Sequence, residues 1–146
     1  WASEPVTKWK TDDETRSSST LTDDGTLTFT VKNGVTYLIE GRLVFYESST
    51  RKAKWSYSVP SATLANRNDF YSNNNEGSVR VKVEDGSLTT VTDITTDVSL
   101  CSVFVSVLLT PSADGTFALQ WANQDGGDAT GPTLKKGSWM RTAVVG

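Results

Sequence analysis

Hydrophobic and polar side chains alternate strictly, with a period of two residues, along several parts of the chain. The first clear example is segment 26–31, which reads Thr-Leu-Thr-Phe-Thr-Val. Because successive side chains of a β-strand point to opposite faces, this pattern predicts a half-buried strand. The dipeptide Asn33-Gly34 follows and favours a tight hairpin turn, and the alternation then resumes over 35–46.

The same alternation predicts further strands over 52–59, 78–84 and 116–123, and a last strand over 139–145. Segment 100–109 is apolar or small on both faces, which predicts a strand that is covered on both sides. About eight strands, turn signals between them and no convincing helix together predict an all-β, jelly-roll-like antiparallel β-sandwich. The predicted core comprises Leu27, Phe29, Val31, Tyr37, Ile39, Phe45, Val79, Val81, Val83, Phe104, Phe117, Leu119 and Trp121.

Two polar segments interrupt this pattern. Residues 1–20 predict an N-terminal arm or an edge strand, and the β-sandwich domain is expected over 21–146. Residues 61–77 are rich in asparagine and predict a long loop, a feature that is uncommon in compact domains and often functional. Two adjacent aromatic residues in this loop either pack back onto the domain or contact a ligand. The candidate ligand or receptor loop therefore contains Asn66, Phe70, Tyr71 and Asn73.

Charge and missing residue types narrow the possible functions. A net charge of −3 argues against sequence-independent binding of nucleic acid, which needs a basic face. The chain has no histidine and one cysteine, so a Ser-His-Asp triad, an intrachain disulfide and a thiolate metal cluster are excluded. No apolar run reaches the roughly 18 residues of a membrane span. We expect no cofactor, no nucleic-acid partner and no membrane insertion.

Acidic residues are the remaining candidates for a cation-binding or catalytic site. Asp23-Asp24-Gly25 favours a turn, with cation binding as the alternative. The acidic loop 125–128 lacks the spacing of a known calcium loop. A glycosidase needs only two carboxylates, so this class stays open, although no carboxylate here has evident apolar surroundings to raise its pKa. The prediction is that the protein is not an enzyme, and that Cys101 is a small core residue.

Surplus apolar faces predict contact between subunits. Segment 35–46 carries apolar residues on its second face as well, beside Glu40 and Arg42, and the valines of 100–109 are interpreted as an outward set. An apolar sheet face of this size needs cover, and closed rotational symmetry supplies it. Cover by the N-terminal arm, or a central core position of 100–109, is the alternative. The predicted interface of a homotrimer comprises Leu38, Val44, Tyr46, Val103, Val105 and Val107.

Several segments follow one another in a characteristic order. They are Ser-Ser-Thr-Leu-Thr-Asp-Asp-Gly-Thr-Leu-Thr-Phe-Thr-Val and Gly-Val-Thr-Tyr-Leu-Ile-Glu-Gly within 18–41, Ala-Lys-Trp-Ser-Tyr-Ser-Val-Pro-Ser-Ala at 53–62, Leu-Gln-Trp-Ala at 119–122, Asp-Ala-Thr at 128–130 and Lys-Gly-Ser-Trp-Met-Arg at 136–141. This ordered set resembles a recurrent domain of tailed-bacteriophage virion proteins, most weakly over 64–98. The strand order also looks like the jelly roll of trimeric tumour-necrosis-factor and complement-type heads, an analogy of fold only.

The resemblance implies a virion structural protein, assembled in the host cytoplasm, whose partners are further copies of itself and other virion proteins. A capsid decoration or head-fibre protein is the favoured interpretation. The alternative is a tail receptor-binding domain that contacts a glycan or protein of the host surface. The resemblance implies no catalytic residues. An arm that docks to the particle would carry Trp1, Val6 and Trp9. The sequence leaves open the choice of capsid or tail, and whether Trp1 begins a processed product or continues a longer chain.

Overall fold

The computed structural model describes residues 4–47, 51–75, 78–89, 91–93, 100–125 and 130–145, without the side chains at 72–75, 78–86 and 93. These residues form twelve strands and no helix. Four strands are short: β1 (Val6–Trp9), β2 (Glu14–Thr15), β8 (Thr92–Asp93) and β11 (Thr133–Leu134). The other eight are β3 (Thr22–Val31), β4 (Tyr37–Tyr46), β5 (Ala53–Ser58), β6 (Ala62–Asn75), β7 (Ser78–Gly86), β9 (Leu100–Pro111), β10 (Gly115–Asn123) and β12 (Trp139–Val144).

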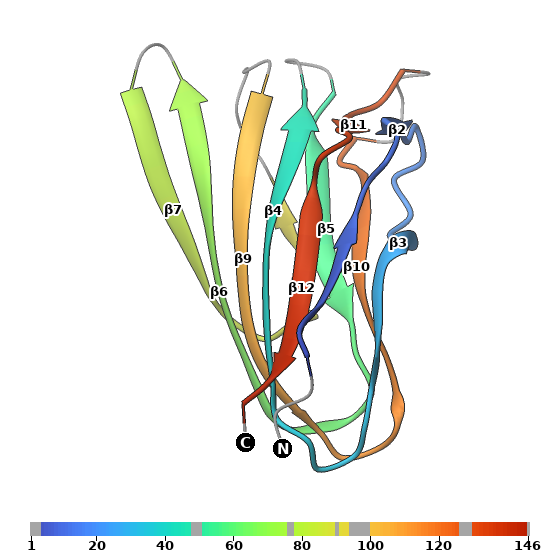
Figure 1. The fold of residues 1–146 in the computed structure, drawn as a ribbon. Coiled ribbons are helices and arrows are strands. Elements are labelled where there is room, and N and C mark those ends of the chain that lie inside the picture. The colour runs from blue at the N-terminus through green and yellow to red at the C-terminus, as the bar shows by residue number, and fades with distance from the viewer. Residues whose placement is uncertain are drawn as a thin grey trace.

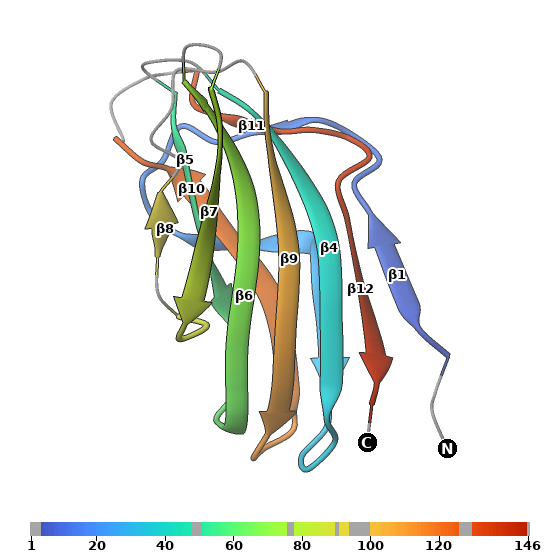
Figure 2. The ribbon, with the colours of Figure 1, turned by 90° about the vertical axis from the view of Figure 1, so that its left-hand side faces the viewer.

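The strands form two antiparallel sheets that pack face to face (Figure 1 and Figure 2). The larger sheet has the order β1-β12-β4-β9-β6-β7, and β11 joins β2 to β4. The smaller sheet has the order β3-β10-β5-β8. The predicted fold class, an all-β sandwich, is confirmed. Among the described residues, no helix has the length and apolar character that crossing a membrane requires.

The core lies between the two sheets and is built from the inward residues of both. Trp55 and Trp121 are its largest fully buried side chains, and Phe45 packs edge-on against Trp121 at 5.7 Å between ring centroids. Cys101 is buried, as predicted. The predicted core is confirmed at Leu27, Phe29, Val31, Tyr37, Ile39, Phe45, Phe117, Leu119 and Trp121, whereas the side chains of Val79, Val81 and Val83 lie outside the described residues.

Strand β9 points its side chains opposite to the sequence-based expectation. Val103, Val105 and Val107 are at most 4% exposed and belong to the core, whereas Phe104 is 49% exposed on the outside. The predictions of outward valines and of a core Phe104 are therefore wrong. Both faces of this segment are apolar, so hydrophobicity alone does not select the inward face. The two serines of β9 lie on the same face as Phe104, and they were the signal for the outward side.

Residues 62–75 form the longest strand, β6, and not the predicted polar loop. Its inward side chains include Arg67, Asp69 and Tyr71, all at most 1% exposed. Because a buried ion pair occupies positions where apolar residues are expected, the alternation of a strand was hidden. Phe70 and Tyr71 point to opposite faces, and the prediction that Tyr71 contacts a ligand is wrong.

Asp69 is the centre of a buried hydrogen-bond network in this part of the core. Its side chain is fully buried and accepts hydrogen bonds from Arg67 Nε at 2.8 Å, Trp55 Nε1 at 3.0 Å, Tyr57 Oη at 2.7 Å and the Ser106 amide at 3.4 Å. Burial and the neighbouring carboxylate raise the pKa of Tyr57 well above its usual value, so its hydroxyl stays protonated and donates. The network fixes β6 against the smaller sheet.

Candidate interaction surface

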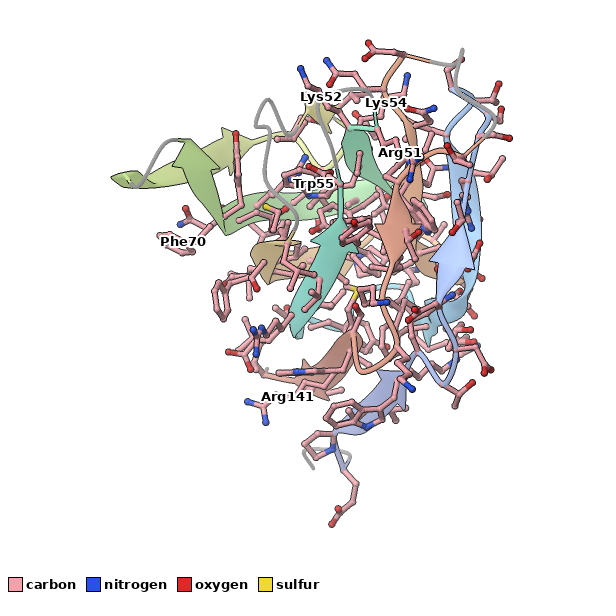
Figure 3. All side chains as sticks on the ribbon, turned by 90° about the horizontal axis from the view of Figure 1, so that it is seen from above. Arg51, Lys52, Lys54, Trp55, Phe70 and Arg141 are labelled. Carbon is pink, nitrogen blue, oxygen red and sulfur yellow. The ribbon has the colours of Figure 1, made fainter. Side chains whose placement is uncertain are left out.

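The side chains of the larger sheet that point away from the smaller sheet form one continuous surface, here called the outer face. It holds seven of the ten exposed large hydrophobic side chains that the structure describes. Figure 3 shows two of its members, Phe70 and Arg141, pointing away from the core, while Trp55 lies inside. The described outer face comprises Thr7, Trp9, Leu38, Glu40, Arg42, Val44, Tyr46, Leu64, Asn66, Asn68, Phe70, Leu100, Ser102, Phe104, Ser106, Leu108, Thr110, Trp139, Arg141 and Ala143.

A row of four aromatic side chains and one arginine crosses the middle of the outer face. Directly opposite residues in antiparallel strands share a face, and the strand registers place five such residues side by side. From β1 to β6 the row runs Trp9, Trp139, Arg42, Phe104 and Phe70. The Trp9 and Trp139 rings lie 5.7 Å apart between centroids. The sequence did not reveal this row, because its members are far apart along the chain.

Threonine, serine and asparagine side chains also lie on the outer face, and its charged side chains have partners. Glu40 accepts hydrogen bonds from Nε and Nη2 of Arg141 at 3.0 and 2.6 Å. Arg42 donates to Ser102 at 3.2 Å and lies 5.9 Å from the ring centroid of Phe104. No lysine and no aspartate belongs to the outer face as described. Aromatic residues and arginine, which this face presents, are the residue types enriched in the cores of protein–protein interfaces.

The outward positions of the smaller sheet provide an internal comparison. On β3 they include Thr28 and Thr30, on β10 Thr116 and Gln120, and on β5 Lys54. None of the described outward positions of β3, β10 and β5 is aromatic. The same chain therefore exposes one polar sheet face and one aromatic sheet face, so the exposed rings are not a general property of its surface.

The structure distributes the sequence-predicted site residues over several places. Leu38, Val44 and Tyr46 lie on the outer face, as predicted. So do Asn66 and Phe70, which belong to β6 and not to a loop. Of Asn73 only the backbone is described, as part of β6, and Trp1 lies outside the described residues.

The predicted docking arm is in part an edge strand, because β1 pairs with β12. Its two exposed candidates point to different sides. Trp9 belongs to the outer face, whereas Val6 points toward the smaller sheet. A docking contact on one side of β1 can therefore include Trp9 or Val6, but not both.

Asp24, one of the acidic candidates, is a structural group, whereas residues 126–128 of the acidic loop lie outside the described residues. Asp24 is fully buried, and its oxygens accept hydrogen bonds from the amides of Thr26 and Leu27, from Lys10 Nζ and from Trp121 Nε1, at 2.9–3.1 Å. Burial acts to raise the pKa of Asp24, but these donors outweigh it and hold the pKa below its usual value. Asp24 lies in a bulge of β3, where the register with β10 shifts. No group of three or more potential metal ligands occurs among the described residues.

Comparisons with known proteins add little to this geometry. No family model and no curated protein sequence matches the chain. Among solved structures, proteins of the Gx and Gt strains of infectious bursal disease virus align at 14% and 12% identity, with TM-scores of 0.19 and 0.21. A mutant VP2 protein of that virus, from derived particles, aligns at 14% identity with a TM-score of 0.22. These alignments cover 97–98% of this chain but only 38–42% of the viral chains. Such TM-scores are too low to establish a relationship of fold or function.

Proposed function

We propose that this chain is a structural protein of a virus particle and that its outer face packs against other protein subunits. The observation that carries the proposal is the contrast between the two sheet faces of one sandwich. Among the described side chains, one face is threonine-rich and polar. The other holds tryptophan, phenylalanine, tyrosine, leucine and arginine beside Glu40 and uncharged polar residues, without lysine or aspartate. Interface cores are enriched in aromatic residues and arginine and depleted in lysine, aspartate and glutamate.

The size of the outer face also suits a subunit contact. Its four central strands, β12, β4, β9 and β6, span about 19 Å at a spacing of about 4.8 Å, and the ten residues of β4 span about 34 Å. The resulting plane of roughly 650 Å² approaches the roughly 800 Å² that each partner contributes to a standard interface. Phe104 and Leu100 are 49% and 57% exposed, so covering each of them would gain about half of the roughly 1.5–3 kcal/mol that complete burial of such a side chain contributes.

The kind of particle follows from the sequence resemblance to virion proteins of tailed bacteriophages. We favour a capsid decoration or head-fibre protein that forms a homotrimer through the outer face and contacts other virion proteins. A tail receptor-binding domain is the second candidate. The exposed rings of Phe70 and Trp9, 41% and 54% exposed, favour it because aromatic rings of this kind also stack on sugars of a host-surface glycan.

Replacing Phe104 by glutamate is expected to dissociate the oligomer, because the change places a charge in the centre of a dry interface. The wild type should sediment as a trimer, at three times the monomer mass of 15.8 kDa, and Phe104→Glu at the monomer mass with unchanged circular dichroism. Thr116→Glu, on the exposed outward side of the smaller sheet, is the matched control and should leave the oligomer intact. Sedimentation equilibrium measures all three.

A wild type that stays at the monomer mass over a wide concentration range would contradict self-association. A dimer would keep the outer face as interface and discard threefold symmetry. The role in a particle is tested separately by quantitative gel densitometry of purified virions. Hundreds of copies per particle would support a capsid location, and a few tens or fewer would support the tail. Absence of the chain from the particles would refute the virion proposal.

A further inference from the structure

A groove opens on the flank of the sandwich where β1 of the larger sheet, labelled in Figure 2, faces β3 of the smaller sheet, labelled in Figure 1. Its volume is about 280 Å³, and it is lined by Val6, Lys8, Phe29, Thr30 and Thr142. Phe29 forms an apolar floor at the edge of the core, where it is only 3% exposed. The groove is separate from the outer face, because Lys8 and Thr142 point to the inner side of their strands.

Two polar groups in the groove lack the partners that burial or charge would normally require. Thr142 is 8% exposed, and its hydroxyl oxygen is buried with no hydrogen-bond partner in the part of the chain that the structure describes. Lys8 lies 5.5 Å above the centroid of the Phe29 ring and has no ion-pair partner among the described residues. Both groups donate hydrogen bonds. A negatively charged acceptor that entered the groove would satisfy both.

The backbone beside the groove offers a second kind of recognition. Within the part of the chain that the structure describes, β3 pairs only with β10, so its other edge is free in the smaller sheet. Every second residue of such a strand presents its N–H and C=O groups away from the sheet. Residues 25–31 of β3 contain no charged residue and no proline, the features that commonly protect an edge. This edge can therefore pair with an additional strand.

We propose that the groove binds an extended acidic segment of a partner polypeptide, which adds a strand to the free edge of β3. The inward side chains of the added strand would point to the same side as Phe29, which is where the groove lies. A carboxylate at one of these positions would meet the ammonium group of Lys8 and the hydroxyl of Thr142. Main-chain hydrogen bonds would supply affinity and the carboxylate would supply specificity. The site does not depend on the proposed function of the outer face.

The test uses three synthetic peptides of alternating threonine and valine whose central residue is glutamate, glutamine or lysine. Nuclear magnetic resonance of the isotopically labelled protein follows binding, and amide hydrogen exchange locates it. The glutamate peptide should slow exchange in β3 between Thr26 and Val31 and should bind at least about tenfold more tightly than the lysine peptide, the ratio that about 1.4 kcal/mol produces. In Lys8→Glu this preference should reverse.

Two further variants make the result specific. Thr142→Val keeps the shape of the side chain but removes the hydroxyl, and it should weaken binding of the glutamate peptide while the protein stays folded. Lys136→Glu changes the same charge at an exposed position outside the groove, and it should leave the preference intact. Equal affinities of all three peptides, or exchange that slows elsewhere than in β3, would overturn the proposal. So would free glutamate that shifts the Lys8 and Thr142 resonances while no peptide protects β3, because the groove would then be a site for small carboxylates.

Discussion

Replacing Asp69 by alanine should lower the free energy of unfolding by about 3–5 kcal/mol, the usual effect of removing one partner from a buried ion pair. Arg67 is only 1% exposed, and without the carboxylate of Asp69 its buried guanidinium group would lose this ion pair. Trp55 and Tyr57 would lose their acceptor at the same time. Urea unfolding at neutral pH, followed by tryptophan fluorescence, measures the change. Most single substitutions lower the free energy of unfolding by less than this expected amount.

A double-mutant cycle separates the ion pair from the rest of the network. Arg67→Met removes the cation but keeps an apolar chain of similar length, and the double variant Arg67→Met/Asp69→Ala removes both charges. Because the double variant removes both charges of this buried ion pair, it should be more stable than Asp69→Ala alone. If Asp69→Ala lowered the free energy of unfolding by less than about 1 kcal/mol, the ion pair would contribute no more than a surface ion pair does. That result would show that the network does not hold β6 in place.

Replacing Glu47 by glutamine is expected to stabilise the protein at neutral pH, whereas Asp69→Ala destabilises it. Glu47 is 1% exposed, one of its oxygens accepts the Ala53 amide at 2.7 Å, and the other is buried and has no hydrogen-bond partner among the described residues. Burial is the main cause that raises the pKa of Glu47 from 4.5 to about 8. Glutamine can accept the same amide and carries no charge to desolvate.

The sign of the pH dependence follows from linkage. Below pH 4.5 the Glu47 carboxyl is protonated in both the folded and the unfolded state, so its ionisation does not lower the free energy of unfolding. Between 4.5 and about 8 only the unfolded chain releases the proton, so Glu47 lowers stability progressively as the pH rises. At about 1.4 kcal/mol per pH unit, the penalty at pH 7 is of order 3 kcal/mol.

Denaturant unfolding of the wild type and of Glu47→Gln at pH 4 and pH 7 tests this expectation. The two proteins should differ little at the lower pH, and the variant should be more stable at the higher pH. Comparing the two proteins cancels the titration of all other groups. A difference in stability that is the same at both pH values would contradict a raised pKa of Glu47.

Period-two alternation was a sufficient guide wherever one face of a strand is apolar and the other polar. In β3 the inward set Leu27, Phe29 and Val31 was predicted correctly, because threonines mark the outward face. In β9 the rule selected the wrong face, since both faces are apolar and a shift by one residue exchanges them. The sequence therefore predicted an apolar outer face on the correct strands, but it assigned the wrong residues of β9 to that face.

The sequence by itself determined the fold class, most of the core and the presence of a surplus apolar sheet face, because these depend on local alternation and composition. Only the tertiary structure decided that Asp69 and Arg67 are core residues, since a buried ion pair has the same sequence pattern as a solvated loop. Only strand register placed Trp139 and Phe104 in one row with Phe70. These decisions depend on which strands become neighbours, and that is set by packing between residues far apart in the chain.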